Sequence, residues 1–209
     1  MILSAHQPSY LPYLGYINKI INCDLFVSMD DVKFSKNSMY AKNYIFLNNK
    51  KLLLSVPIIN STKNNLIKDV EICGKDWKKD HLTKIKLAYK NHYYYHDFIE
   101  YFEKIYLKEW KWLADLNHEI LFFIKNIFQI KTEIKIASSF NFTGNKNEKL
   151  INYCKQFNAT KYIFGKNGKS YADENSFAAN NISISFQDFQ CPNNNFSFVD
   201  YLFKHGVKL

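Results

Sequence analysis

A histidine and a glutamine stand where a short apolar segment meets a helical one near the N-terminus. Residues 2–5 are apolar, residues 14–22 have helical periodicity, and His6 and Gln7 open the proline-containing loop between them. A strand that ends in a polar loop before a helix places this loop at the carboxyl edge of a sheet, where open α/β sheets bind ligands. A histidine there can act as a general acid or base, or bind a phosphate. The alternative is a plain strand–helix connection in which His6 is only hydrogen-bonded.

A second group of charged residues follows the next apolar run. Asp30 and Asp31 come directly after residues 24–29, which are suited to a buried strand. The polar residues that come next are Lys33, Lys36, Lys42 and Asn43. Two acids followed by lysines can bind an amine together with a phosphate, or hold a divalent metal with a phosphate. The alternative is a solvated turn in which the aspartates cap the backbone.

Two polar residues fall on the apolar sides of helices predicted in the middle of the chain. His81 shares a helical face with Trp77, and Asn117 interrupts the apolar stripe of a helix over residues 110–128. A buried asparagine must find partners or costs about 1–3 kcal/mol. These groups are either satisfied in the core or line a pocket above the sheet edge. The glycine-containing loop 165–169 can cradle a phosphate, although it lacks the P-loop pattern and a plain turn is the simpler interpretation.

Strands and helices alternate on both sides of a helical middle section. Short strands are predicted over residues 2–5, 24–29, 69–73, 134–137, 161–165 and 182–186, and a hairpin over 44–47 and 52–56. The intervening segments have helical periodicity. The pattern predicts a single α/β domain with a Rossmann-like, mostly parallel sheet, a small β-hairpin and a helical insert at about residues 75–130.

Composition narrows the function classes. The 209 residues carry a net charge of +9 and no arginine, so lysines, backbone N–H groups or neutral donors must hold any anion. The lysines are scattered without a dense patch, and we therefore do not expect nucleic acid as a partner. The four isolated cysteines, the lack of a signal peptide and the lack of an apolar run near ~20 residues predict a reduced, cytoplasmic protein without a membrane span.

The motif HQPSYLPYLGY at residues 6–16, followed by Lys19 and by DLFVSMDDVKF at residues 24–34, resembles the WbqC-like family of bacterial proteins. Further positions that fit the family are Trp77, His81, Tyr89, Asn117 and the segments 162–165 and 198–206. The chain has Lys42 where the family usually has arginine, and residues 189–193 also differ from its pattern. The resemblance implies a role in gene clusters for O-antigen and other surface polysaccharides, with glycine or aminoacyl transfer as the proposed activity.

These observations lead to the hypothesis of an enzyme that transfers an acyl or glycyl group from an acyl donor to the amine of a nucleotide-linked deoxyamino sugar. His6 is the predicted base, while Asp30 and Asp31 orient the amine or a metal. The predicted substrate-binding residues are Gln7, Tyr10, Tyr13, Lys33, Lys36, Lys42, Asn43, His81 and Asn117. ATP and a divalent metal remain open as cofactors. The alternatives are a nucleotidylyltransferase-like enzyme and a non-catalytic nucleotide-sugar-binding protein.

Overall fold

A computed structural model describes residues 1–35, 38–48, 50–59, 65–192 and 196–208, so that Lys36 and residues 193–195 lie outside the described residues. The contacts within the chain divide it into two compact units. The first consists of Met1–Gln7, Gly15–Val32 and Ile130–Gln190, and the second of Pro8–Leu14, Lys33–Gln129 and Cys191–Leu209.

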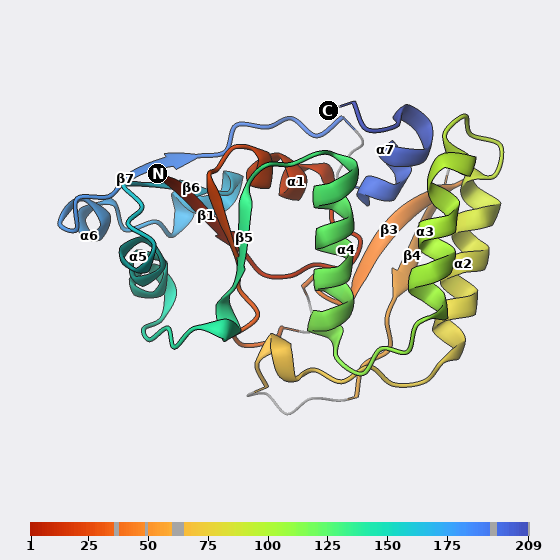
Figure 1. The fold of residues 1–209 in the computed structure, drawn as a ribbon, viewed down its shortest axis with the longest axis horizontal. Coiled ribbons are helices and arrows are strands. Elements are labelled where there is room, and N and C mark those ends of the chain that lie inside the picture. The colour runs from red at the N-terminus through yellow and green to blue at the C-terminus, as the bar shows by residue number, and fades with distance from the viewer. Residues whose placement is uncertain (36–37, 49, 60–64, 193–195, 209) are drawn as a thin grey trace. The chain divides into compact units, whose positions relative to one another are not determined.

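The first unit is built on a five-stranded sheet in which every neighbouring pair of strands is parallel, in the order β5-β2-β1-β6-β7 (Figure 1). Its strands are β1 (Ile2–His6), β2 (Leu25–Ser28), β5 (Glu133–Ile136), β6 (Lys161–Phe164) and β7 (Ser183–Phe186). The helices that belong with this sheet are α1 (Leu14–Ile21), α5 (Lys146–Gln156) and α6 (Glu174–Ala178). The predicted α/β fold with a Rossmann-like parallel sheet is confirmed.

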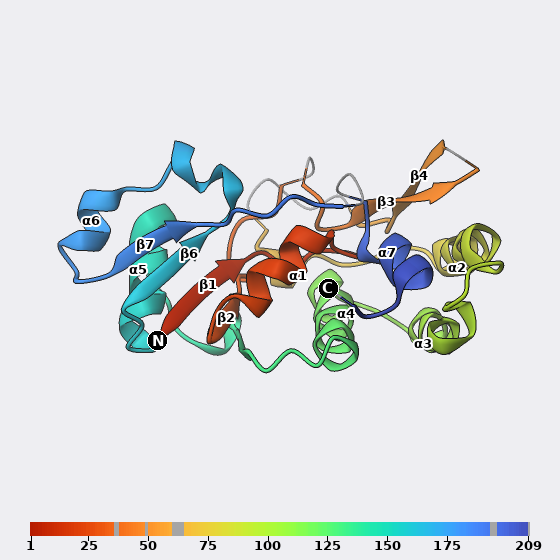
Figure 2. The ribbon, with the colours of Figure 1, turned by 90° about the horizontal axis from the view of Figure 1, so that it is seen from above.

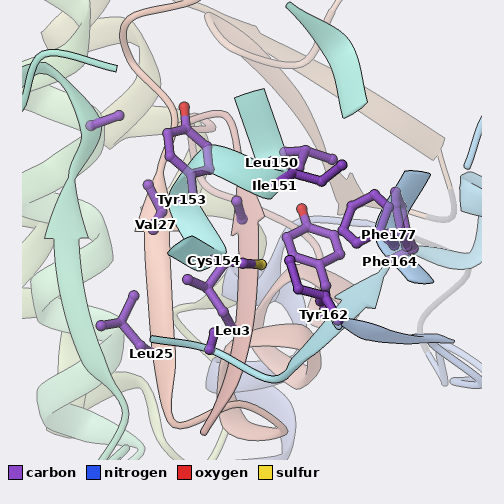
Figure 3. Close-up of a cluster of buried hydrophobic side chains, with 14 residues drawn as sticks. Leu3, Leu25, Val27, Leu150, Ile151, Tyr153, Cys154, Tyr162, Phe164 and Phe177 are labelled. Atoms are coloured by element: carbon purple, nitrogen blue, oxygen red, sulfur yellow. The ribbon is translucent and has the colours of Figure 1, made fainter. Parts of the chain in front are cut away.

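Successive side chains along each strand point to opposite faces of this sheet. One face of β1, β2 and β6 forms an apolar core with α5 and α6 (Figure 3). The labelled members of this core are Leu3, Leu25, Val27, Leu150, Ile151, Tyr153, Cys154, Tyr162, Phe164 and Phe177. On the opposite face, the ring of Tyr16 from α1 packs edge-on against Phe26 and His6. Because Leu3 and Ala5 face α5, His6 cannot share their face and lies beside α1.

The second unit contains the predicted hairpin and helical insert. Its elements are β3 (Lys42–Leu47), β4 (Lys50–Ser55), α2 (Asp76–Tyr89), α3 (Tyr95–Leu107), α4 (Leu113–Ile127) and α7 (Phe198–His205). β3 and β4 pair antiparallel, and α2 and α3 lie side by side in both views of the ribbon (Figures 1 and 2). In the described parts of the chain, no helix is both long enough and apolar enough to cross a bilayer.

The prediction of a strand over residues 69–73 is wrong. This segment follows a short 3-10 helix, Ile67–Asp69, and makes only two isolated bridges, one from Ile72 to Ile58 and one from Glu71 to Trp112. The two bridging residues pair with different segments of the chain, so no continuous ladder of hydrogen bonds can form.

Candidate active site

The carboxyl edge of the parallel sheet carries the first predicted group of residues. From the central strand β1, the chain adds β2 and β5 on one side, and then β6 and β7 on the other. Strand order therefore reverses beside β1, and in open α/β sheets ligands bind outside the carboxyl ends of the strands at such a point. His6 is the last residue of β1, and its carbonyl oxygen accepts a hydrogen bond from the backbone N–H of Met29 at 2.8 Å. This bond ties the loop after β1 to the loop after β2, which carries Asp30 and Asp31.

The imidazole of His6 has a defined tautomer. Its Nδ1 lies 2.9 Å from the carbonyl oxygen of Gln7, and since a carbonyl can only accept, Nδ1 must carry the hydrogen. Burial and the charge of Lys19 lower the pKa of His6 from 6.5 to about 4, so the ring is neutral at pH 7. The other ring nitrogen, Nε2, is then unprotonated and has no hydrogen-bond partner among the described residues. As a whole residue His6 is partly buried, and Nε2 is the ring nitrogen that is left to accept a hydrogen bond or a proton.

Lys19 and Tyr16, both on α1, contact the last residues of β1. The side chain of Lys19 is 5% exposed and its Nζ donates to the carbonyl oxygen of Ala5 at 2.7 Å. Burial lowers its pKa from 10.5 to about 8. The hydroxyl of Tyr16 is buried without a hydrogen-bond partner, and burial raises its pKa. Both residues belong to the segment that carries the family resemblance, but neither was predicted as a site residue, although their spacing of three on a predicted helix places them on one face.

Asp30 lies at the same edge and is engaged by the loop after β5. Its two carboxylate oxygens accept from the backbone N–H of Ser138 at 2.8 Å and from the Ser138 hydroxyl at 2.6 Å. Ser138 belongs to a short 3-10 helix, Ala137–Ser139, that follows β5 directly. Asp30 is 2% exposed. Because its carboxylate binds Ser138, it joins the end of β2 to the end of the neighbouring β5, as a capping group does.

Asp31, which is partly buried, forms an ion pair with the buried Lys149 on the α5 side of the sheet. One of its oxygens lies 2.6 Å from Nζ of Lys149, and the other accepts from the hydroxyl of Tyr153 at 3.2 Å. Within the described residues, no three His, Cys, Asp or Glu side chains are grouped in a way that could hold a metal ion. The structure therefore places both aspartates near the end of β1 but directs their carboxylates to Ser138, Lys149 and Tyr153.

The glycine-containing loop after β6 forms a short 3-10 helix, Lys166–Ser170. Gly168 is buried within it, and a Cβ at this position would lie 2.4 Å from Cβ of Phe164. The glycine is thus required for close packing onto β6. A separate groove of about 520 Å³ lies between α5 and α6, and none of the predicted site residues line it.

The other predicted binding residues belong to the second unit, and several are held inside it. The hydroxyl of Tyr10 bonds to Nδ1 of His81 at 2.8 Å and to the hydroxyl of Tyr106 at 2.6 Å. Nε2 of His81 accepts from the backbone N–H of Ser55 at 3.1 Å, so Nδ1 carries the hydrogen. Burial lowers the pKa of His81 to about 4.

Two asparagines of the second unit bind backbone carbonyls. Asn43 donates to Leu11 at 2.6 Å and Asn117 donates to Tyr40 at 2.8 Å, which fixes the residues around the N-terminal motif. The remaining predicted binding residues are more open: Tyr13 and Lys42 are partly buried, Lys33 is exposed, and Gln7 of the first unit is partly buried. His6, Gln7, Asp30 and Asp31 thus share one sheet edge, while the other described members of the predicted set lie in the second unit.

The strand order and the histidine at the end of the central strand define a Rossmann-like α/β protein with a candidate site at the carboxyl edge of its sheet. The chain belongs to the WbqC-like protein family, whose model matches residues 7–208. It is similar to the uncharacterized protein Rv1507c of Mycobacterium tuberculosis, with 28% identity over 185 residues that cover 88% of this chain and 80% of the relative. No solved structure matches the chain.

Proposed function

We propose that the protein is an enzyme of surface-polysaccharide synthesis that transfers an acyl or aminoacyl group, such as glycyl, to the amine of a nucleotide-linked deoxyamino sugar. Membership of the WbqC-like family supports the polysaccharide setting. One observation carries the catalytic part of the proposal: His6 is neutral and has an unprotonated Nε2 at the end of the central strand. In a sheet of this order, that position adjoins the place where nucleotides bind.

In the proposed reaction His6 is the general base. The amine nitrogen of the sugar attacks the carbonyl carbon of the acyl donor and forms the new C–N bond. The bond between that carbon and the leaving group breaks, and the leaving group takes the electron pair. The amine proton passes to Nε2 of His6, which then gives it to the leaving group. The low pKa of His6 keeps Nε2 unprotonated before substrate binds, and an anionic substrate beside the ring raises that pKa toward the useful range.

The other predicted residues take supporting roles in this proposal. Asp30 and Asp31 hold the loop after β2 beside His6 through Ser138 and Lys149, and their orientation of the amine or of a metal stays a prediction. Binding of the substrate's diphosphate by Lys33, Lys36 and Lys42 stays a prediction, in a chain without arginine. ATP is the proposed source of activation for a free amino acid donor, and the cytoplasm is the proposed compartment.

The experiment incubates the protein with a nucleotide-linked 4-amino-4-deoxy sugar, labelled glycine and ATP, and follows the sugar by mass spectrometry. We expect the mass to increase by one glycyl residue. The His6→Gln variant should be slower by about 100- to 10,000-fold, the usual contribution of a general base. His96→Gln changes an exposed histidine on α3 and is the matched control. Equal rates for His6→Gln and the wild type would contradict the role of His6.

A nucleotidylyltransferase is the second candidate, because the reversal of strand order beside β1 is where many nucleotide-binding sheets hold their ligand. The same incubation separates the two. Pyrophosphate release that requires an amino acid supports acyl activation and transfer. Pyrophosphate release from a nucleoside triphosphate and a sugar phosphate, without any amino acid, supports nucleotidyl transfer instead.

A further inference from the structure

The buried lysine on α1 has an unusual environment for a charged group. Lys19 is 5% exposed and donates to one backbone carbonyl, that of Ala5. No carboxylate of the described residues pairs with it, whereas Lys149, a second buried lysine, is paired with Asp31. Burying an ammonium group without a counter-ion costs several kcal/mol. Ionisable groups with such perturbed environments cluster at functional sites.

The position of this ammonium relates it to His6 in two ways. Ala5, whose carbonyl oxygen it binds at 2.7 Å, directly precedes His6 in β1. Tyr16, one turn before Lys19 on the same helix, packs its ring edge-on against the imidazole with centroids 5.1 Å apart. Lys19 and Tyr16 therefore fix the backbone and the ring of His6 from the same helix.

The other ionisable groups around His6 and Lys19 leave the lysine as the main charge that acts on His6. Tyr16 is a neutral phenol because burial raises its pKa. Cys23, which follows α1, is a neutral thiol because burial raises its pKa to about 12. Asp30 and Asp31 in the loop after β2 are bound by Ser138 and Lys149. A proton on His6 is then opposed by the ammonium of Lys19 and is not compensated by any of these groups.

We propose that Lys19 is the positioning residue of His6: its buried ammonium fixes the end of β1 through the Ala5 carbonyl and places a positive charge near the imidazole, whose Nε2 is left available to take a proton. This role rests on the proposed function of His6 as the base, since the charge of Lys19 adds to the burial that keeps that base unprotonated at the working pH. Lys19 itself does not touch the reacting atoms in this proposal.

The test follows the imidazole of His6 by NMR in protein labelled with ¹⁵N-histidine, with the signal assigned by its loss in His6→Gln. In the wild type we expect a titration midpoint near pH 4 and, at pH 7, the ¹⁵N shifts of a ring protonated on Nδ1. In Lys19→Met the midpoint should rise from about 4 toward 6.5 but not reach it, because burial still disfavours the charged ring. Lys19→Arg keeps the charge and should restore a low midpoint.

The matched control is Lys155→Met, which removes an exposed lysine from α5 of the same unit and should leave the midpoint unchanged. Circular dichroism verifies that each variant is folded. The wild-type measurement stands even when Lys19→Met does not fold: a midpoint near 6.5, or a ring protonated on Nε2, would overturn the proposal. An unchanged midpoint in folded Lys19→Met would also overturn it. The titration needs no substrate, so its failure is distinct from failure of the transfer assay.

Discussion

Replacing His81 by glutamine is expected to reduce the acid sensitivity of folding. His81 is 2% exposed, and burial lowers its pKa from 6.5 to about 4 in the folded protein. In the unfolded chain its pKa returns to 6.5, so the unfolded state binds more protons than the folded state between pH 6.5 and 4. The contribution of this histidine to stability is therefore complete above pH 6.5 and is lost as the pH falls toward 4.

The two pKa values set the size of the effect. Proton linkage gives a loss of about 2.5 kcal/mol in the free energy of unfolding from His81 alone between pH 7.5 and 4.5. Glutamine retains an acceptor for the N–H of Ser55 and a donor for the hydroxyl of Tyr10, so we expect the variant to fold, with a cost of about 1–2 kcal/mol at pH 7.5.

The assay is urea unfolding of wild type and His81→Gln at both pH values. Groups that titrate in both proteins, including His6, cancel when the two pH-dependent losses are subtracted. The loss should be smaller by about 2.5 kcal/mol in the variant, whereas His96→Gln, which changes an exposed side chain, should behave as the wild type. Equal losses in wild type and His81→Gln would refute the reasoning, because His81 would then not be held neutral by the fold.

Three further predictions concern the first unit and the cysteines. Asp31→Asn leaves the buried ammonium of Lys149 without its partner and should lower the free energy of unfolding by about 2–4 kcal/mol in urea titrations; a change below ~0.5 kcal/mol would show that the pair is not formed. Gly168→Ala should cost about 1–3 kcal/mol in the same measurement, because the new Cβ has no room, whereas Gly165→Ala meets no atom within 4 Å and should be nearly neutral. Brief treatment of the folded protein with iodoacetamide should modify the partly exposed thiols of Cys73 and Cys191 before the buried thiols of Cys23 and Cys154, whose pKa is raised to about 12. Peptide mass spectrometry measures the order, and faster modification of Cys23 and Cys154 would contradict this prediction.

Most of the secondary structure could be predicted from local patterns. The apolar run before His6 forms β1, and the stripe that includes Leu113 and Ile120 forms α4. These predictions succeed because the periodicity of a strand or a helix is visible in the order of apolar and polar residues that are close together in the sequence. The predicted strand over residues 69–73 fails because a strand needs a continuous partner, and its bridging residues have two different ones.

The partners of the candidate site residues could not be predicted in this way. Asp30 is bound by Ser138, and Asp31 by Lys149, each more than a hundred residues further along the chain. No local pattern links such pairs, and the lysine of this ion pair looked like one of many solvated lysines in the sequence. The buried position of Lys19 was equally hidden, because an amphipathic helix can carry a lysine at the edge of either face.

By itself, the sequence determined the elements, their alternation and the place of His6 at the end of the first strand, since these follow from periodicity and from the residues that interrupt it. The tertiary structure alone decided the strand order and the direction of each carboxylate. It also decided the protonation state of His6, because a pKa depends on burial and on charges brought near by folding. The residue types suggested a base, and the packing of α1 against β1 determines whether that base is neutral.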